Sequence, residues 1–113
     1  MRGVTLAGWF STDGREGLSK DRYTIESATH MTGDTWLFQA RIRFGKHDVA
    51  VPVPVTVRWA GDTPVIMVTD LSIPGMGTYT ARVVIYRDRY AGTWKGGKHA
   101  GAMFGGIERD SGK

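Results

Sequence analysis

Residues 49–69 read VAVPVPVTVRWAGDTPVIMVT, and this stretch decides the fold. From 49 to 59 every second residue is apolar, which is the period of a strand with one buried face. The Gly-Asp pair that follows favours a tight hairpin, because Gly adopts positive φ and Asp tolerates it. A two-residue loop then makes the apolar faces of both strands coincide. The predicted cross-strand pairs are Ala60 with Thr63, Trp59 with Pro64, Val57 with Ile66, and Val55 with Val68.

The same alternation continues on both sides of this hairpin. It is clearest over 36–44, where Trp, Phe, Ala, Ile and Phe alternate with Leu, Gln and Arg. A second Gly-Asp turn at 33–34 sets Met31 opposite Trp36, and a four-residue loop over 45–48 sets Phe44 opposite Val49. The remaining predicted strands are Val4–Ser11, Arg22–Met31, Pro64–Thr69, Thr78–Tyr86, Tyr90–Lys95 and Ala100–Glu108.

These eight segments with short connections predict an all-β fold, an eight-stranded antiparallel up-and-down meander. A meander leaves two unpaired edge strands, and pairing the first strand with the last removes both, so we expect a closed barrel. Glycines inside the last two strands suit tight coiling of the sheet. Residues 12–21 are predicted to form a short helix or a lid loop, because Asp13 and Glu16 have the spacing of a capping box.

The closing segments carry a family resemblance. Residues 6–10 read LAGWF, 91–97 read AGTWKGG and 104–107 read FGGI. Together with the meander they resemble the calycin group, which comprises lipocalins, avidins and fatty-acid-binding proteins, and in particular uncharacterised bacterial lipocalin-like proteins. Lipocalins begin their first strand with glycine, any residue and tryptophan, whereas here a glycine directly precedes Trp9. The resemblance implies a barrel open at one end, and by analogy a ligand inside it.

Composition bounds the function classes. The 113 residues suffice for one domain over 1–113, with flexible ends expected at about 1–3 and 110–113. No cysteine is present, which excludes disulfides, thiolate nucleophiles and Cys-based zinc sites. No apolar run is long enough to span a bilayer and the N-terminus is too polar for a signal peptide, so a soluble chain without a membrane partner is expected. The net charge of +4 permits an anionic partner, but the arginines are spread along the sequence, which speaks against nucleic acid.

Catalytic patterns are absent from the sequence. His30, His47 and His99 have no metal-binding spacing, and no serine has the surroundings of a nucleophile elbow. Asp34, Asp62 and Asp88 fall in turns. We therefore predict no catalytic residues, no metal and no cofactor, and expect a protein that is not an enzyme.

A ligand site is predicted at one end of the barrel. The connections of a meander alternate between its two ends, and the longer ones, at 12–21, 45–48, 71–77 and 96–99, share one end. Their apolar and cationic residues suit a small apolar or amphipathic ligand. Trp36, Phe38, Phe44, Trp59 and Trp94 should point inward and leave a small cavity. The predicted ligand-binding residues are Leu18, Lys46, His47, Met76, Trp94, Lys98 and His99.

The alternative function is that of an interaction module. Residues 64–69 are apolar on both faces, which is unusual for a strand with one face in water. We expect this outer surface to pack in a homodimer, with Met67 near the centre. The two prolines of the neighbouring strand should also weaken its hydrogen bonding to one neighbour. The predicted interface residues are Pro52, Pro54, Val65, Met67, Val84 and Tyr86.

Overall fold

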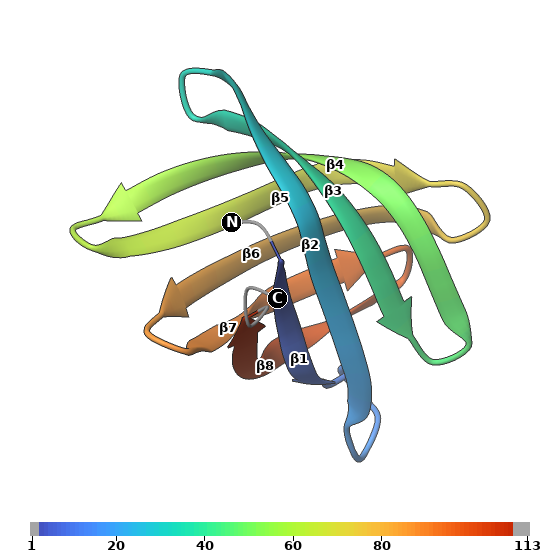
Figure 1. The fold of residues 1–113 in the computed structure, drawn as a ribbon. Coiled ribbons are helices and arrows are strands. Elements are labelled where there is room, and N and C mark those ends of the chain that lie inside the picture. The colour runs from blue at the N-terminus through green and yellow to red at the C-terminus, as the bar shows by residue number, and fades with distance from the viewer. Residues whose placement is uncertain (1–2, 110–113) are drawn as a thin grey trace.

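A computed structural model describes residues 3–109, which form the predicted eight-stranded antiparallel meander (Figure 1). Each strand pairs with the next along the chain, and β1 pairs with β8, so the sheet closes into a barrel. The predicted all-β closed barrel is thus confirmed. The strands are β1 (Val4–Phe10), β2 (Ser19–Thr32), β3 (Thr35–Phe44), β4 (His47–Ala60), β5 (Thr63–Ile73), β6 (Gly77–Tyr86), β7 (Arg89–Gly96) and β8 (His99–Arg109).

Closure of the barrel extends beyond the ends of β1. The ladder between β1 and β8 runs from Val4 opposite Arg109 to Phe10 opposite Met103. It continues into the following loop, where the Ser11 N–H donates to the Ala102 carbonyl at 2.9 Å. At the other end it is the pairing with β2 that is extended, because the Gly3 N–H donates to the Ile25 carbonyl at 3.0 Å. The other residues of the predicted flexible ends, 1–2 and 110–113, lie outside the described residues.

The helix considered for 12–21 is wrong. Residues 11–18 form an irregular loop, and nothing within 3–109 is helical. Gly14 and Gly17 take φ of +83° and +86°, which a right-handed helix cannot accommodate. The Asp13 N–H donates to the Ala100 carbonyl of β8 at 2.8 Å, so the loop starts as a continuation of the sheet. Accordingly, none of the described residues forms a helix that could cross a bilayer.

Five hairpins have two-residue turns, and in each the first turn residue has positive φ. Gly occupies that position at 33, 45, 61 and 97, whereas Arg87 occupies it in the turn between β6 and β7. The predicted four-residue loop over 45–48 is therefore wrong, because Gly45 allows a tighter turn that sets Phe44 opposite His47. The predicted pairing of Met31 with Trp36 is also wrong. A register shift near Met31 places His30 opposite Trp36.

The ladder between β4 and β5 is short. The predicted pairs Ala60–Thr63, Trp59–Pro64 and Val57–Ile66 are present, and pairing ends at Thr56 opposite Met67. Within residues 3–109, no pair joins the rest of β4 to β5, so the predicted Val55–Val68 pair does not form. A bulge after Val68, where Asp70 has φ +53°, bends β5 away. We call this unpaired boundary between 47–55 and 68–73 the seam.

The prolines of β4 face the seam. The Val57 N–H donates to the Asp34 carbonyl at 2.8 Å, so odd-numbered residues of β4 direct their N–H groups toward β3. Pro52 and Pro54 therefore face β5, and neither can donate a hydrogen bond there. The weakened hydrogen bonding to one neighbour that was predicted from these two prolines is confirmed.

Glycines let aromatic rings lie flat on the inner wall. Tyr90, Gly105, Gly8 and Asp21 stand opposite one another in a row across β7, β8, β1 and β2. A Cβ at Gly8 would lie 2.8 Å from the Tyr90 hydroxyl oxygen, and one at Gly105 would lie 2.9 Å from its Cε1. Both positions therefore require glycine beneath the Tyr90 ring. The same arrangement recurs where Trp94 lies over Gly101.

Candidate functional site

The barrel encloses an apolar cavity of about 190 Å³. Every strand contributes inward-facing side chains to its wall, and the deeper part of the wall is aliphatic. Toward the tight-turn end, where the chain termini lie, buried side chains such as Val4 and Ile85 fill the interior. The cavity lining includes Leu6, Ile25, Phe38, Ala40, Ile42, Val53, Val55, Ile66, Val68, Leu71, Ile73, Ala81, Val83 and Met103.

Four aromatic rings surround the cavity at the opposite end, which carries the loops 11–18, 45–46, 74–76 and 97–98. Phe10, Phe44, Tyr79 and Trp94 all line the cavity and come from β1, β3, β6 and β7. Phe10 contacts Trp94 edge-to-face at a centroid distance of 5.7 Å, and contacts Phe44 at 6.0 Å. Phe44 in turn lies 6.5 Å from Tyr79. These rings form a connected aromatic rim, which is the arrangement expected of rigid apolar contact surfaces.

The polar atoms beside the cavity already have partners. The Trp94 indole N–H donates to the Ser11 carbonyl at 2.9 Å, and the Tyr79 hydroxyl donates to the Met76 carbonyl at 2.9 Å. The Tyr23 hydroxyl donates to Asp21 at 2.9 Å. Among the described residues, no buried side-chain nitrogen or oxygen lacks a hydrogen-bond partner. The cavity wall therefore offers a ligand apolar contact and no vacant polar partner.

Asp21 is a buried carboxylate next to this wall. Its two oxygens accept hydrogen bonds from the Tyr90 hydroxyl at 3.0 Å and from Tyr23, and its residue is 4% exposed. Burial raises the pKa of Asp21, and the two tyrosine hydrogen bonds oppose that rise. Burial and the neighbouring carboxylate likewise raise the pKa values of Tyr23 and Tyr90, so both stay protonated donors. The Tyr90 hydrogen bond ties β7 to β2 across the two glycines, whereas the Tyr23 hydrogen bond lies within β2.

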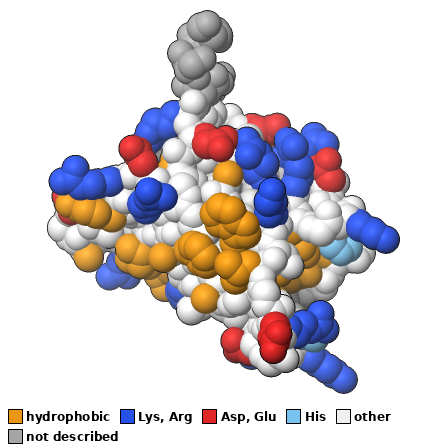
Figure 2. All heavy atoms as spheres, turned by 90° about the horizontal axis from the view of Figure 1, so that it is seen from below, with side chains coloured by type: hydrophobic (Ala, Val, Ile, Leu, Met, Phe, Trp, Pro, Cys, Tyr) orange, Lys and Arg blue, Asp and Glu red, His pale blue; other side chains and the backbone are white. Residues whose placement is uncertain are grey.

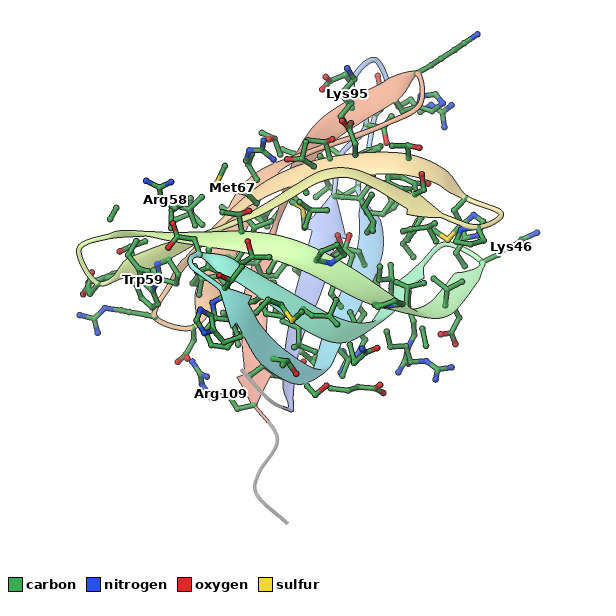
Figure 3. All side chains as sticks on the ribbon, turned by 90° about the horizontal axis from the view of Figure 1, so that it is seen from above. Lys46, Arg58, Trp59, Met67, Lys95 and Arg109 are labelled. Atoms are coloured by element: carbon green, nitrogen blue, oxygen red, sulfur yellow. The ribbon has the colours of Figure 1, made fainter. Side chains whose placement is uncertain are left out.

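All seven residues predicted to bind ligand lie in the described part of the chain, and Trp94 alone lines the cavity. His47 packs on the Phe44 ring at 5.0 Å, and Met76 accepts the Tyr79 hydrogen bond, so these two lie just outside the rim. Figure 3 shows Lys46 extending outward from its turn, at the opposite end of β4 from Trp59. The other three are solvent-exposed at the same end: Leu18 and Lys98 on loops, and His99 at the start of β8.

The carboxylate two residues after Lys46 in the chain, Asp48, is paired with an arginine. Asp48 accepts a hydrogen bond from the Arg41 Nε at 2.8 Å, and this arginine holds the pKa of the Asp48 carboxyl below its usual value.

Trp59, predicted to point inward, is 65% exposed because it belongs to the hairpin that projects beyond the barrel wall. That prediction is wrong, whereas Phe38 is buried and Trp36 is half-buried against the core.

The six predicted interface residues fall into two groups. Val65 and Val84 stand directly opposite each other on β5 and β6, with Met67 and Tyr86 two positions along. Pro52 and Pro54 instead lie opposite Gln39 and Leu37 of β3, on the far side of the seam. The surface that these residues were predicted to share is therefore interrupted.

Sequence reasoning missed several residues that the fold brings together. The roles of Phe10 and Tyr79 in the rim, and the contact of Asp21 with Tyr90, depend on strands far apart in sequence. Trp9 and Phe104 lie on the outside, each 42% exposed, with ring centroids 6.1 Å apart. Alternation in β1 could have shown this for Trp9, because Val4, Leu6 and Gly8 take the inner positions. The chain matches no protein-family model, no curated protein and no solved structure.

Proposed function

We propose that the protein is a noncatalytic barrel that binds a small apolar or amphipathic molecule in the cavity beneath the aromatic rim. The observation that carries this proposal is an apolar space of about 190 Å³ whose neighbouring polar atoms are all engaged. Apolar cavities of about 150 Å³ stay dry and take up benzene, so a cavity of this size favours such a ligand over water.

Cavity size limits the ligand class. Sites for drug-sized ligands measure about 300–1,000 Å³, so the ligand here is expected to place one ring or a short acyl chain inside. An amphipathic ligand would keep its anionic end outside the rim, near Lys46, His47, Lys98 and His99. A closed barrel with a small cavity supports storage or recognition of such a molecule. Nothing in the cavity wall supports acid–base chemistry.

Calorimetric titration with benzene, toluene and hexanoate tests the proposal. We expect binding with a dissociation constant of about 0.1–1 mM, roughly 4–5.5 kcal/mol, and a change in Trp94 fluorescence. Filling the cavity with Ala81→Leu should abolish binding without loss of thermal stability, since Ala81 lines the cavity. The matched control is Ala50→Leu, an exposed position on the outside of β4, which should bind as the wild type does.

Two results would overturn the proposal. One is the absence of heat and of a stability increase with every compound at millimolar concentration. The other is undiminished binding by the folded Ala81→Leu protein, which would place the bound compound elsewhere.

A further inference from the structure

The outer wall of the barrel carries an unbroken apolar row. Cross-strand pairing sets five outward residues in line across β5, β6, β7, β8 and β1. We call this the outer row, and it consists of Val65, Val84, Ala91, Phe104 and Trp9. Its members Val84, Phe104 and Trp9 are each 42% exposed. Figure 2, which views the side where β7, β8 and β1 lie, shows a band of hydrophobic side chains with Lys and Arg, and also some Asp and Glu, around it.

Small side chains flank the outer row. Ala102 on β8 and Ala7 on β1 are its neighbours along the strands, and Gly106 stands opposite Ala7. The central part of this face therefore has a low relief, above which Phe104, Trp9 and Tyr86 protrude. Such a contiguous apolar area on the outside of a small protein marks a contact site more often than a solvated surface.

Lysine and arginine residues lie at both ends of the outer row and in the two rows that flank it. The outer row continues at one end from Trp9 to Lys20, and at the other from Val65 to Arg58. The two parallel rows contain Arg82, between Met67 and Thr93, and Arg89, between Tyr86 and Gly106. Three nearby carboxylates are each paired with an arginine: Glu108 with Arg22 at 2.7 Å, Asp34 with Arg58 at 3.4 Å, and Asp88 with Arg109 at 3.7 Å. Among the described residues, Lys20, Arg82 and Arg89 form no ion pair, so the border keeps an excess of positive charge.

We propose that this face binds the surface of an anionic lipid bilayer. Aromatic and aliphatic side chains can enter the interfacial region, while Lys and Arg at the border meet lipid phosphates. This contact needs no membrane-spanning segment, and the sequence excluded a membrane partner only for lack of such a segment. It is also independent of the cavity, because the outer row and the cavity lining occupy opposite faces of the strands.

A second copy of the chain fits the same face less well. Five strands spaced by about 4.8 Å and three rows of outward residues cover only a few hundred Å², whereas a stable dimer buries about 800 Å² per partner. A two-fold contact would also bring one cationic border against another. Both points favour an anionic apolar surface over the homodimer predicted from sequence.

Co-sedimentation with vesicles tests this inference on the intact chain. We expect binding to vesicles made of equal parts phosphatidylcholine and phosphatidylglycerol, weakening as salt is added, and no binding to phosphatidylcholine alone. Trp9→Ser combined with Phe104→Ser should reduce binding about tenfold or more. Lys20→Glu combined with Arg89→Glu should reduce it by more than about tenfold at low salt.

Matched controls separate the face from general stickiness. Trp59→Ser removes another exposed tryptophan away from the outer row, and Arg15→Glu reverses an exposed charge in the loop after β1; both should bind as the wild type does. Melting curves establish that each variant is folded. Absence of binding to anionic vesicles would overturn the proposal. A second result would also overturn it: sedimentation equilibrium without lipid shows a dimer of the wild type, and the Trp9→Ser, Phe104→Ser protein is a monomer. A second copy of the chain would then occupy the face.

Discussion

At the scale of single residues, Asp21 shows how this barrel accommodates a charge. A buried carboxylate is costly unless its oxygens accept hydrogen bonds. Tyr23 and Tyr90 supply two, and Tyr90 reaches Asp21 only because Gly8 and Gly105 leave room for its ring. Net desolvation still raises the pKa of Asp21 in the folded state. The protonated form is therefore the one that folding favours.

The sign of the pH dependence follows from that shift. When the folded pKa exceeds the unfolded value of about 3.9, the folded protein binds more protons, and stability falls as pH rises from about 3.9 through the folded pKa. We expect Asp21→Asn to lose this dependence. The unfolding free energy of the variant minus that of the wild type should therefore grow as pH rises through that window. Urea unfolding of both proteins at several pH values measures the difference. A difference that decreases with pH would contradict the burial argument.

At the scale of secondary-structure elements, the five two-residue turns share one backbone feature, a positive φ at the first turn residue. Each needs positive φ at its first position, which costs a residue with a Cβ about 1–2 kcal/mol relative to glycine. Four turns use Gly, and the turn between β6 and β7 uses Arg87 at φ +55°. The Arg87 guanidinium lies 5.3 Å from the centre of the Tyr86 ring, which offsets a part of that cost.

Exchanging the residues between two of these turns tests this explanation. We expect Arg87→Gly to raise the unfolding free energy by about 0.5–1 kcal/mol, and Gly97→Arg to lower it by about 1 kcal/mol. A Cβ at Gly97 would meet no atom within 4 Å, so its effect comes from the backbone alone. Chemical denaturation of the two variants provides the measurement. Opposite signs are required, and destabilisation by Arg87→Gly would show that the ring contact outweighs the backbone term.

The alternation of residues is local information, which is why all eight strands could be predicted from the sequence. Register could be predicted where a Gly-Asp turn starts a regular ladder, as from Ala60 to Val57, and failed where a bulge intervenes, as at Met31 and Asp70. The site was less predictable because Phe10, Phe44 and Trp94 meet only once β1, β3 and β7 curve around one axis. Alternation assigns a side chain to a face, but not to a partner two strands away.

At the scale of the whole molecule, the seam divides the continuous ladder of the barrel. Along β4 the odd-numbered amides bond to β3, whereas the Ala50 N–H faces β5 where no ladder forms. We expect the Ala50 amide to exchange with solvent deuterium at least about a thousandfold faster than those of Val51 and Val53, given the range of local opening energies within one domain. Exchange followed by NMR measures all three. Equal protection of Ala50 and Val51 would mean that the seam is closed in solution.

Closing a sheet into a barrel removes its edges, but the seam restores two of them along part of their length. An unpaired edge invites backbone pairing with another chain and so the growth of aggregates. On the β4 side, Pro52 and Pro54 leave two consecutive donor positions of that edge without an N–H. A foreign strand could not complete a regular ladder there. The same two residues that keep this side of the barrel open therefore protect the opening against polymerisation.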